Sequence, residues 1–324
     1  MSAEFQLIDL EIPRELTGER LDRVLARLLP EHSRTRIRGW IDAGDVEVGG
    51  RRCKPSDPAQ GGARVRLRIG PAAPVVSVLP ESIELNVVHR DRDCFVIDKP
   101  AGLVVHPGAG NPRHTLQNAL LALDPLLAAV PRAGIVHRLD KDTSGLLVVA
   151  RNLEAQTSLA RQLAARTVSR EYRALCRGVP TAGGTISQPI GRHRSDRLRM
   201  AVRGDGRPAV THYRVLERFR AHALCGVSLE TGRTHQIRLH LAYAHHAIVG
   251  DPTYGGRLTR PRGATPELVE ALRAFKRQAL HAAILSFDHP RTGRRLTFES
   301  PLPADFEHLL AVLRRDLRAA AEAP

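Results

Sequence analysis

The sequence predicts an α+β fold: helices packed on a mixed, mostly antiparallel sheet, preceded by a smaller domain of two helices and short strands. Three observations carry this prediction. The 324 residues are enough for one large and one small domain, and 42% of them are hydrophobic, which suffices for a packed core. Near the N-terminus, helical spacing of apolar residues gives way to short alternating segments. The rest is rich in strand patterns joined by hairpin-length connections.

Two helices are expected first. Apolar residues within 21–28 repeat at helical spacing, and Pro30 ends that helix. Ser33 is a suitable N-cap for a second helix that runs to Ala43, because a serine side chain accepts a hydrogen bond from the first turn. Gly44 then follows in the position that ends helices in a left-handed conformation.

Short strands complete the small domain. Residues 46–48 alternate as a strand, and Gly49 and Gly50 make a tight turn. Residues 64–69 alternate apolar side chains on one face with arginines on the other. The Gly, Pro and Ala residues at 70–74 are predicted to link this domain to the larger one.

The larger domain begins at about residue 82. Residues 103–105 are expected to pair with the strand at 94–97. Strands are predicted at 94–97, 103–105, 146–150, 172–176, 211–216, 224–229, 284–287 and 296–298. Helices are predicted at 115–123, 153–165, 236–243, 266–279 and 304–321.

The chain is strongly basic. It has 49 Lys and Arg residues against 34 Asp and Glu residues, a net charge of +15, and only four of the cations are lysines. An arginine-favouring codon usage would explain the ratio of Arg to Lys but not the excess of positive over negative charge. The planar guanidinium suits phosphates and base edges. A polyanionic partner, RNA or DNA, is therefore favoured over a merely solvated basic surface.

The cysteines and the N-terminus bear on the compartment. Cys53, Cys94, Cys176 and Cys225 lie far apart, which argues against a zinc ribbon and fits free thiols in a reducing cytosol. The first residues lack the basic and apolar regions of a signal peptide, and no apolar run approaches the roughly 18 residues of a membrane span. We expect a soluble, cytoplasmic protein.

The most informative stretch is a charged turn between the apolar residues 133–136 and the strand at 146–150. Its sequence is His137-Arg138-Leu139-Asp140-Lys141-Asp142-Thr143-Ser144-Gly145-Leu146-Leu147. Apolar flanks place the turn at the end of a buried strand, where a carboxylate can be held rigidly as a base, a nucleophile or a metal ligand. On residue types alone, a structural Asx turn built on the same side chains is the stronger interpretation.

The turn resembles the catalytic motif of the RluA/RluD family of pseudouridine synthases. The similarity spans about residues 15–310, and residues 15–78 resemble an S4 RNA-binding domain, which leaves 82–315 as the catalytic domain. Further matching segments follow in the family's order at 97–107, 170–175, 229–240, 249–256 and 278–282.

The resemblance implies an isomerisation: the N-glycosidic bond of a uridine is cut, and the uracil is turned and rejoined through carbon 5. Such a reaction needs no redox cofactor, no ATP and, in this family, no metal. Asp140 matches the family's essential aspartate, and Tyr172 its active-site tyrosine, for which core packing is the structural alternative. Arg233 matches the arginine that pairs with the carboxylate, whereas Arg238 is expected to point elsewhere and to serve structure or RNA phosphate.

Further arginines are expected to contact RNA. Arg138 matches the arginine that replaces the flipped nucleotide in the stack, with an ion pair to Asp142 as the competing account. Two other groups are candidates. The first lies at the start of the second helix, where the macrodipole disfavours cations unless an anion such as a phosphate binds there; the second lies in a hairpin or loop at 192–200, which grips the RNA stem in this family. These groups are Arg34, Arg36 and Arg38, and Arg194, Arg197 and Arg199.

The likeness is strongest to family members that act on the large ribosomal subunit. It implies a monomer that modifies 23S rRNA, at the stem-loop of helix 69. Two alternatives stay open. An RNA-binding module without catalysis would need the charge but not Asp140, Tyr172 and Arg233 together. A metal-dependent hydrolase could draw its ligands from several His and Asp residues, but their spacing argues against it: His235, His240, His245, His246, Asp140, Asp142 and Asp251.

Overall fold

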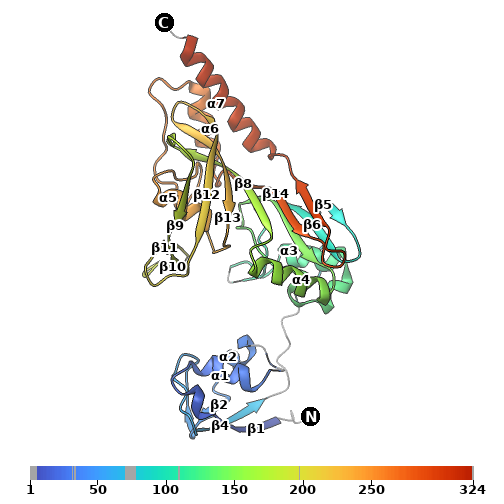
Figure 1. The fold of residues 1–324 in the computed structure, drawn as a ribbon. Coiled ribbons are helices and arrows are strands. Elements are labelled where there is room, and N and C mark those ends of the chain that lie inside the picture. The colour runs from blue at the N-terminus through green and yellow to red at the C-terminus, as the bar shows by residue number, and fades with distance from the viewer. Residues whose placement is uncertain are drawn as a thin grey trace. The chain divides into compact units, whose positions relative to one another are not determined.

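The computed structural model describes residues 6–322 except 31, 33, 70–77, 109 and 197. The predicted linker at 70–74, the Ser33 cap and Arg197 therefore lie outside the described residues. The chain divides into two compact units, Met1–Ser77 and Val78–Pro324, and each is described by itself. Figure 1 traces both.

The first unit packs two helices on a small antiparallel sheet in the order β1-β4-β2-β3. Leu25 of α1 and Ile37 of α2 are fully buried against Val65 and Leu67 of β4, so the apolar face of each predicted helix meets the apolar face of the predicted strand. Gly44 has the left-handed φ of +82° expected at the end of α2. The elements are β1 (Gln6–Glu11), α1 (Leu21–Leu28), α2 (Arg34–Ala43), β2 (Val46–Val48), β3 (Arg51–Arg52) and β4 (Arg64–Ile69).

The second unit carries the large sheet. Its strands are β5 (Asn86–Arg90), β6 (Cys94–Lys99), β7 (Ser144–Ala150), β8 (Ser169–Arg177), β9 (Gly184–Ser187), β10 (Ile190–Arg192), β11 (Met200–Val202), β12 (Val210–Arg218), β13 (His222–Leu229), β14 (Leu280–Asp288) and β15 (Arg295–Glu299). Its α-helices are α3 (Leu116–Leu123), α4 (Leu153–Ala164), α5 (Gln236–Tyr243), α6 (Pro266–Ala274) and α7 (Ala304–Glu322). The side chains of Thr115 and Asn152 cap α3 and α4.

Nine strands form the main sheet in the order β5-β6-β7-β14-β8-β13-β12-β9, with β15 pairing with β14. Only the short contact between β7 and β14 is parallel, at His281 opposite Ser144 and Ala282 opposite Gly145. The other pairs in this sheet are antiparallel. This arrangement confirms the predicted α+β class with a mixed, mostly antiparallel sheet.

Two element predictions were wrong. Residues 103–105 form no strand beside β6, because β6 is already paired on both sides with β5 and β7; Val104 makes only an isolated parallel bridge with Thr115. The helix predicted over 266–279 ends at Ala274, and Phe275 is extended. The chain must straighten there because β14 begins at Leu280.

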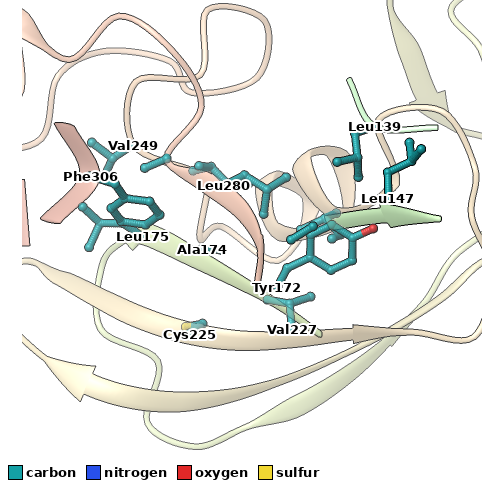
Figure 2. Packing of buried hydrophobic residues seen from close by; sticks show 14 of the residues in the cluster. Leu139, Leu147, Tyr172, Ala174, Leu175, Cys225, Val227, Val249, Leu280 and Phe306 are labelled. Atoms are coloured by element: carbon teal, nitrogen blue, oxygen red, sulfur yellow. The ribbon is translucent and has the colours of Figure 1, made fainter. Parts of the chain in front are cut away.

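Strands β6 and β7 are buried on both faces of the sheet. Phe95 and Ile97 of β6 belong to the main core cluster, whereas their neighbours Cys94 and Val96 belong to a second cluster on the opposite face, which includes Leu159 of α4. Side chains alternate between the two faces of a strand, so such strands form near-continuous apolar runs. Figure 2 shows part of the main cluster, into which Phe306 of α7 also packs. This double packing gives the motif turn before β7 a rigid support.

No helix within the described ranges is long and apolar enough to cross a bilayer. The four cysteines are free thiols; Cys94, Cys176 and Cys225 are buried, and Cys53 is partly buried.

Candidate active site

Asp140 lies in a tight turn that leads into β7. The backbone N–H of Thr143 donates to the carbonyl of Asp140 at 3.1 Å. Gly145 ends the turn with a φ of +111°, and a Cβ there would lie 2.3 Å from the carbonyl oxygen of Ala282. Only glycine allows β7 and β14 to approach so closely. The Gly of the motif therefore fixes the place of the carboxylate relative to the sheet.

Lys99 supports this turn from inside the protein. The side chain is fully buried and donates to the carbonyls of Pro100 at 2.7 Å, Leu103 at 2.9 Å and Lys141 at 3.0 Å. Burial lowers the pKa of Lys99 to about 7. The protonated ammonium group has three N–H donors, and the three carbonyl oxygens around it accept all of them. Because Lys141 follows Asp140, the bond to its carbonyl anchors the backbone beside the carboxylate.

A second anchor comes from the segment at 278–282. Gln278 Nε2 donates to Thr143 Oγ1 at 3.1 Å, and Ser144 Oγ lies 2.9 Å from His281 Nδ1. All four side chains are buried. The segment at 278–282 therefore holds the turn that contains Asp140, although the two are more than 130 residues apart in sequence.

Arg238 is the cation that pairs with Asp140. Its Nη1 lies 3.1 Å from Asp140 Oδ2, while Nε and Nη2 hold both carboxylate oxygens of Asp251 at 2.7 and 2.8 Å, and Nη2 also donates to Thr253 Oγ1 at 3.0 Å. Burial alone would lower the pKa of Arg238, but the hydrogen bonds and charges of Asp251 and Asp140 outweigh it and raise that pKa. Burial alone would raise the pKa of Asp251, and Arg238 outweighs it and lowers that pKa.

The expected pairing of Arg233 with Asp140 is therefore wrong, as is the expectation that Arg238 points elsewhere. Arg233 lies before the first turn of α5, and its Nε donates to the carbonyl of Pro208 at 3.3 Å. Arg238 lies within α5, where Ile237 and Leu239 on either side of it are also buried. A lone cation inside an apolar helical stretch needs a buried anion. That signal was present in the sequence and was missed.

Tyr172 is buried in β8 opposite Val227 of β13, as Figure 2 shows, so it belongs to the core as the structural alternative held. It also lines the same cleft as Asp140. Burial raises the pKa of its hydroxyl, with the charge of Arg170 acting in the opposite direction. The phenol therefore stays protonated and can donate a hydrogen bond inside the cleft.

The cleft has a volume of about 460 Å³, within the usual range of a small-molecule site. His137 lines it in neutral form, because burial and then the charge of Arg170 lower its pKa to about 3. Arg138 is exposed and also lines the cleft, and the ion pairs found among the described residues do not include one between Arg138 and Asp142. Arg233 lines the cleft too.

The candidate RNA-binding arginines lie in both units. In the first, Arg34 Nη2 pairs with the buried Asp22 at 2.8 Å, Arg36 lies over the ring of Trp40, and Arg38 is 3.7 Å from Asp42. In the second, Arg194 and Arg199 are exposed in the antiparallel hairpin formed by β10 and β11, here called the basic hairpin (residues 190–202).

The histidine of α5, His240, is held by hydrogen bonds to its neighbours. His240 bonds Thr211 Oγ1 at 2.9 Å and the carbonyl of Gln188 at 3.0 Å. Over the described part of the chain, His, Cys, Asp and Glu side chains form two groups of three that could hold a metal ion: His89, Asp91 and Cys94, and Asp91, Asp93 and His289. Neither group contains any of the ligands considered above for a hydrolase. The geometry gives the metal-dependent hydrolase no support.

Comparison with known proteins agrees with the motifs. The family model described as RNA pseudouridylate synthase matches residues 93–243, and that of the S4 domain matches residues 19–65. Ribosomal large subunit pseudouridine synthase D of Xanthomonas campestris is 55% identical over 311 residues, covering 96% of this chain and 94% of that protein. The protein of the same name from Pseudomonas aeruginosa is 56% identical over 309 residues, covering 95% of this chain and 96% of that protein.

A solved structure shares the fold over three quarters of this chain. Human RNA Pseudouridylate Synthase Domain Containing 1 is 28% identical, covers 75% of this chain and 97% of its own, and superposes with a TM-score of 0.55.

The chain belongs to the RNA pseudouridine synthase family, and the resemblance drawn from the motifs is confirmed. It is an isomerase that carries an S4 domain. The alternative of an RNA-binding module without catalysis is therefore rejected.

Proposed function

We propose that this enzyme isomerises uridines of 23S rRNA, at the stem-loop of helix 69, with Asp140 as the catalytic carboxylate. The relatives named as large-subunit synthases support the ribosomal substrate. The observation that carries the catalytic part is the Arg238 contact to Asp140 Oδ2 at 3.1 Å, beside Tyr172 in one cleft. An opposite charge at this distance orients the carboxylate, whose side chain is 17% exposed.

The chemistry balances without an added reactant. The bond between uracil N1 and ribose C1′ breaks, the bond between C5 and C1′ forms, and the proton on C5 is lost while N1 gains one. Asp140 acts at the junction of sugar and base, and the ring of Tyr172 supports the uracil. The neutral phenol of Tyr172 assists the proton transfer at C5. Electrons are neither gained nor lost overall, so we propose that the enzyme needs no cofactor and no metal.

Access to the base requires the uridine to leave its stack. Arg138 is exposed and lines the cleft. In this proposal its guanidinium stacks and hydrogen-bonds where the base had been. The arginines of the S4 domain and of the basic hairpin would hold the RNA backbone while this occurs. We propose that the protein acts as a monomer in the cytoplasm, where ribosomes are assembled.

The test of this function is a map of pseudouridine in rRNA and tRNA from cells lacking the protein, complemented with wild type or with Asp140→Ala. Loss of the marks in the helix 69 loop, restored by wild type alone, would establish reaction, substrate and catalytic residue together. Loss of marks elsewhere would replace the substrate, and an unchanged map would reject the proposal for these RNAs.

Tyr172→Phe is expected to bind RNA as wild type does and to turn over at least about tenfold more slowly, because the ring that packs and stacks remains while the proton-transfer group is lost. Binding by filter retention and single-turnover rates on a helix 69 stem-loop check this. Tyr213→Phe, which also lies in the sheet but outside the cleft, serves as the control. Unchanged kinetics for Tyr172→Phe would favour a packing role.

Neutralising Arg194, Arg197 and Arg199 together is expected to flatten the salt dependence of RNA binding. Each phosphate contact contributes about 0.7 to 0.9 to the slope of log K against log salt, so the slope should fall by about 2 to 3. Affinities measured from low to moderate salt give this slope. Replacing the ion-paired Arg295, Arg314 and Arg315 removes the same number of charges and controls for net charge. The same slope as wild type would mean that the basic hairpin is merely solvated.

A further inference from the structure

Tyr254 meets both the basic hairpin and the active site. Its backbone N–H donates to Asp251 Oδ1 at 3.0 Å, so it belongs to the turn that presents Asp251 to Arg238. Its Oη accepts a hydrogen bond from the backbone N–H of Met200 at 2.8 Å, and Met200 begins β11 of the basic hairpin. The same Oη lies 3.0 Å from Nδ1 of His235. One hydroxyl therefore joins three segments that are distant in sequence.

The ring of Tyr254 also lies close to two cations. Arg238 Cζ is 5.2 Å from the ring centroid, and Arg199 Cζ is 5.5 Å from it. Both distances are within the range of a cation–π interaction. Arg238 holds the carboxylate of Asp140, and Arg199 is an exposed arginine of the basic hairpin. The ring thus contacts both the active-site cation and a candidate RNA-binding cation.

His235 completes the arrangement. It adopts a left-handed φ of 56° immediately before α5, and it lines the active-site cleft. Burial lowers the pKa of His235 against the charge of Asp140, which acts in the opposite direction. A neutral imidazole can accept a hydrogen bond from Tyr254 Oη at Nδ1, while that oxygen accepts a hydrogen bond from the backbone N–H of Met200. The hydroxyl also lies 3.4 Å from the carbonyl oxygen of Met200, so both backbone polar groups of that residue face it.

We propose that Tyr254 is a positioning residue that couples the basic hairpin to the ion pair of Arg238 and Asp140. The hydroxyl fixes the end of the hairpin, and the ring holds the guanidinium of Arg238 in the orientation in which it reaches both Asp251 and Asp140. RNA that binds Arg199 then engages the same side chain that supports the catalytic carboxylate. This inference rests on the proposed function, because it assigns the hairpin to RNA.

Two substitutions separate the hydroxyl from the ring. Tyr254→Phe removes only Oη, and we expect KM for a helix 69 stem-loop to rise about fivefold to tenfold, the factor that one or two ordinary hydrogen bonds give, with kcat within about twofold of wild type. Tyr254→Leu also removes the ring, and we expect kcat to fall by at least about tenfold in addition. Tyr243→Phe, an exposed tyrosine at the end of α5, is the matched control and should behave as wild type.

The outcomes are distinct. Wild-type KM in Tyr254→Phe, or wild-type kcat in Tyr254→Leu, would overturn the proposal. Equal losses of kcat in both variants would also overturn it, because the ring would then have no separate role. Should the leucine variant be unfolded in a thermal melt, the phenylalanine variant decides alone: KM must rise while kcat is retained.

Amide hydrogen exchange separates this inference from the substrate assignment. If wild type converts no uridine in the stem-loop, the helix 69 proposal fails, and exchange in RNA-free protein then decides the role of Tyr254. Faster exchange of residues 198–202 in Tyr254→Phe than in wild type and Tyr243→Phe would support the proposal that the hydroxyl of Tyr254 fixes the end of the basic hairpin. Identical exchange in all three proteins would overturn it.

Discussion

Replacing Asp140 by asparagine is expected to lower the single-turnover rate of uridine conversion by at least about a thousandfold. The amide has nearly the same shape, so the hydrogen bond from Thr143 to the backbone of residue 140 and the packing of the turn should persist. What disappears is the negative charge that Arg238 holds at 3.1 Å. The rate is measured by release of tritium from carbon 5 of uridine in the stem-loop RNA.

The matched control is Asp142→Asn, two residues further along the same turn. Its backbone carbonyl, which accepts from Arg277 Nη1 at 3.4 Å, is untouched by the substitution. We expect this variant to keep its rate within about threefold of wild type. RNA affinity of Asp140→Asn should also be retained, since phosphate contacts dominate binding. A single-turnover rate of Asp140→Asn within about tenfold of wild type would remove Asp140 from the catalytic role.

Much of the fold was predictable because local signals agreed with the tertiary packing. The helices at 153–165 and 236–243 and the strands at 94–97 and 146–150 have a clear period and recognisable ends, and they form within a few residues of their predicted bounds. Residues 103–105 have the composition of a strand but no free edge of β6 to pair with. Which strands are neighbours is a property of the whole sheet, and composition does not contain it.

The site was predictable to the extent that a motif marks position. Asp140 and Tyr172 were named from the sequence and line one cleft. The cation was assigned to Arg233 instead of Arg238, because a motif gives residue types and not the direction of a side chain. That direction depends on where α5 begins and on Asp251, which lies 13 residues beyond Arg238 in sequence. Tyr254 was not singled out at all, since its partners Met200 and His235 meet it only in the folded chain.

Arg238→Met is expected to have the largest effect on stability. The change leaves Asp251, whose side chain has no exposed surface, without its cation. Removing one partner of a buried ion pair typically lowers the free energy of unfolding by about 3 to 5 kcal/mol. Asp140 also loses its contact, and misplacement of a catalytic group by about 1 Å can slow a reaction about a hundredfold. Urea denaturation and single-turnover rates measure the two effects.

Two further variants make this prediction specific. Arg238→Lys keeps a charge, but a lysine cannot span the three carboxylate oxygens that the guanidinium reaches, so it should recover only part of the stability and little of the rate. Arg233→Met is the matched control: its Nε meets only a backbone carbonyl at 3.3 Å, and we expect less than about 1 kcal/mol. If Arg233→Met lost as much activity as Arg238→Met, the pairing expected from the sequence would be restored.

The pH dependence of stability tests the same ion pair independently. Because the folded protein lowers the pKa of Asp251, the unfolded chain binds the proton more readily. The stabilisation from this pair is therefore present in full above the ordinary pKa of an aspartate, about 3.9, and is lost as the pH falls through the lower folded value. Asp251→Asn removes this titration, so its unfolding free energy should decline less steeply with acid than that of wild type. Parallel acid profiles for the two proteins would mean that Arg238 and Asp251 do not form a charged pair. The position of Arg238 beside Asp140 would then need another explanation.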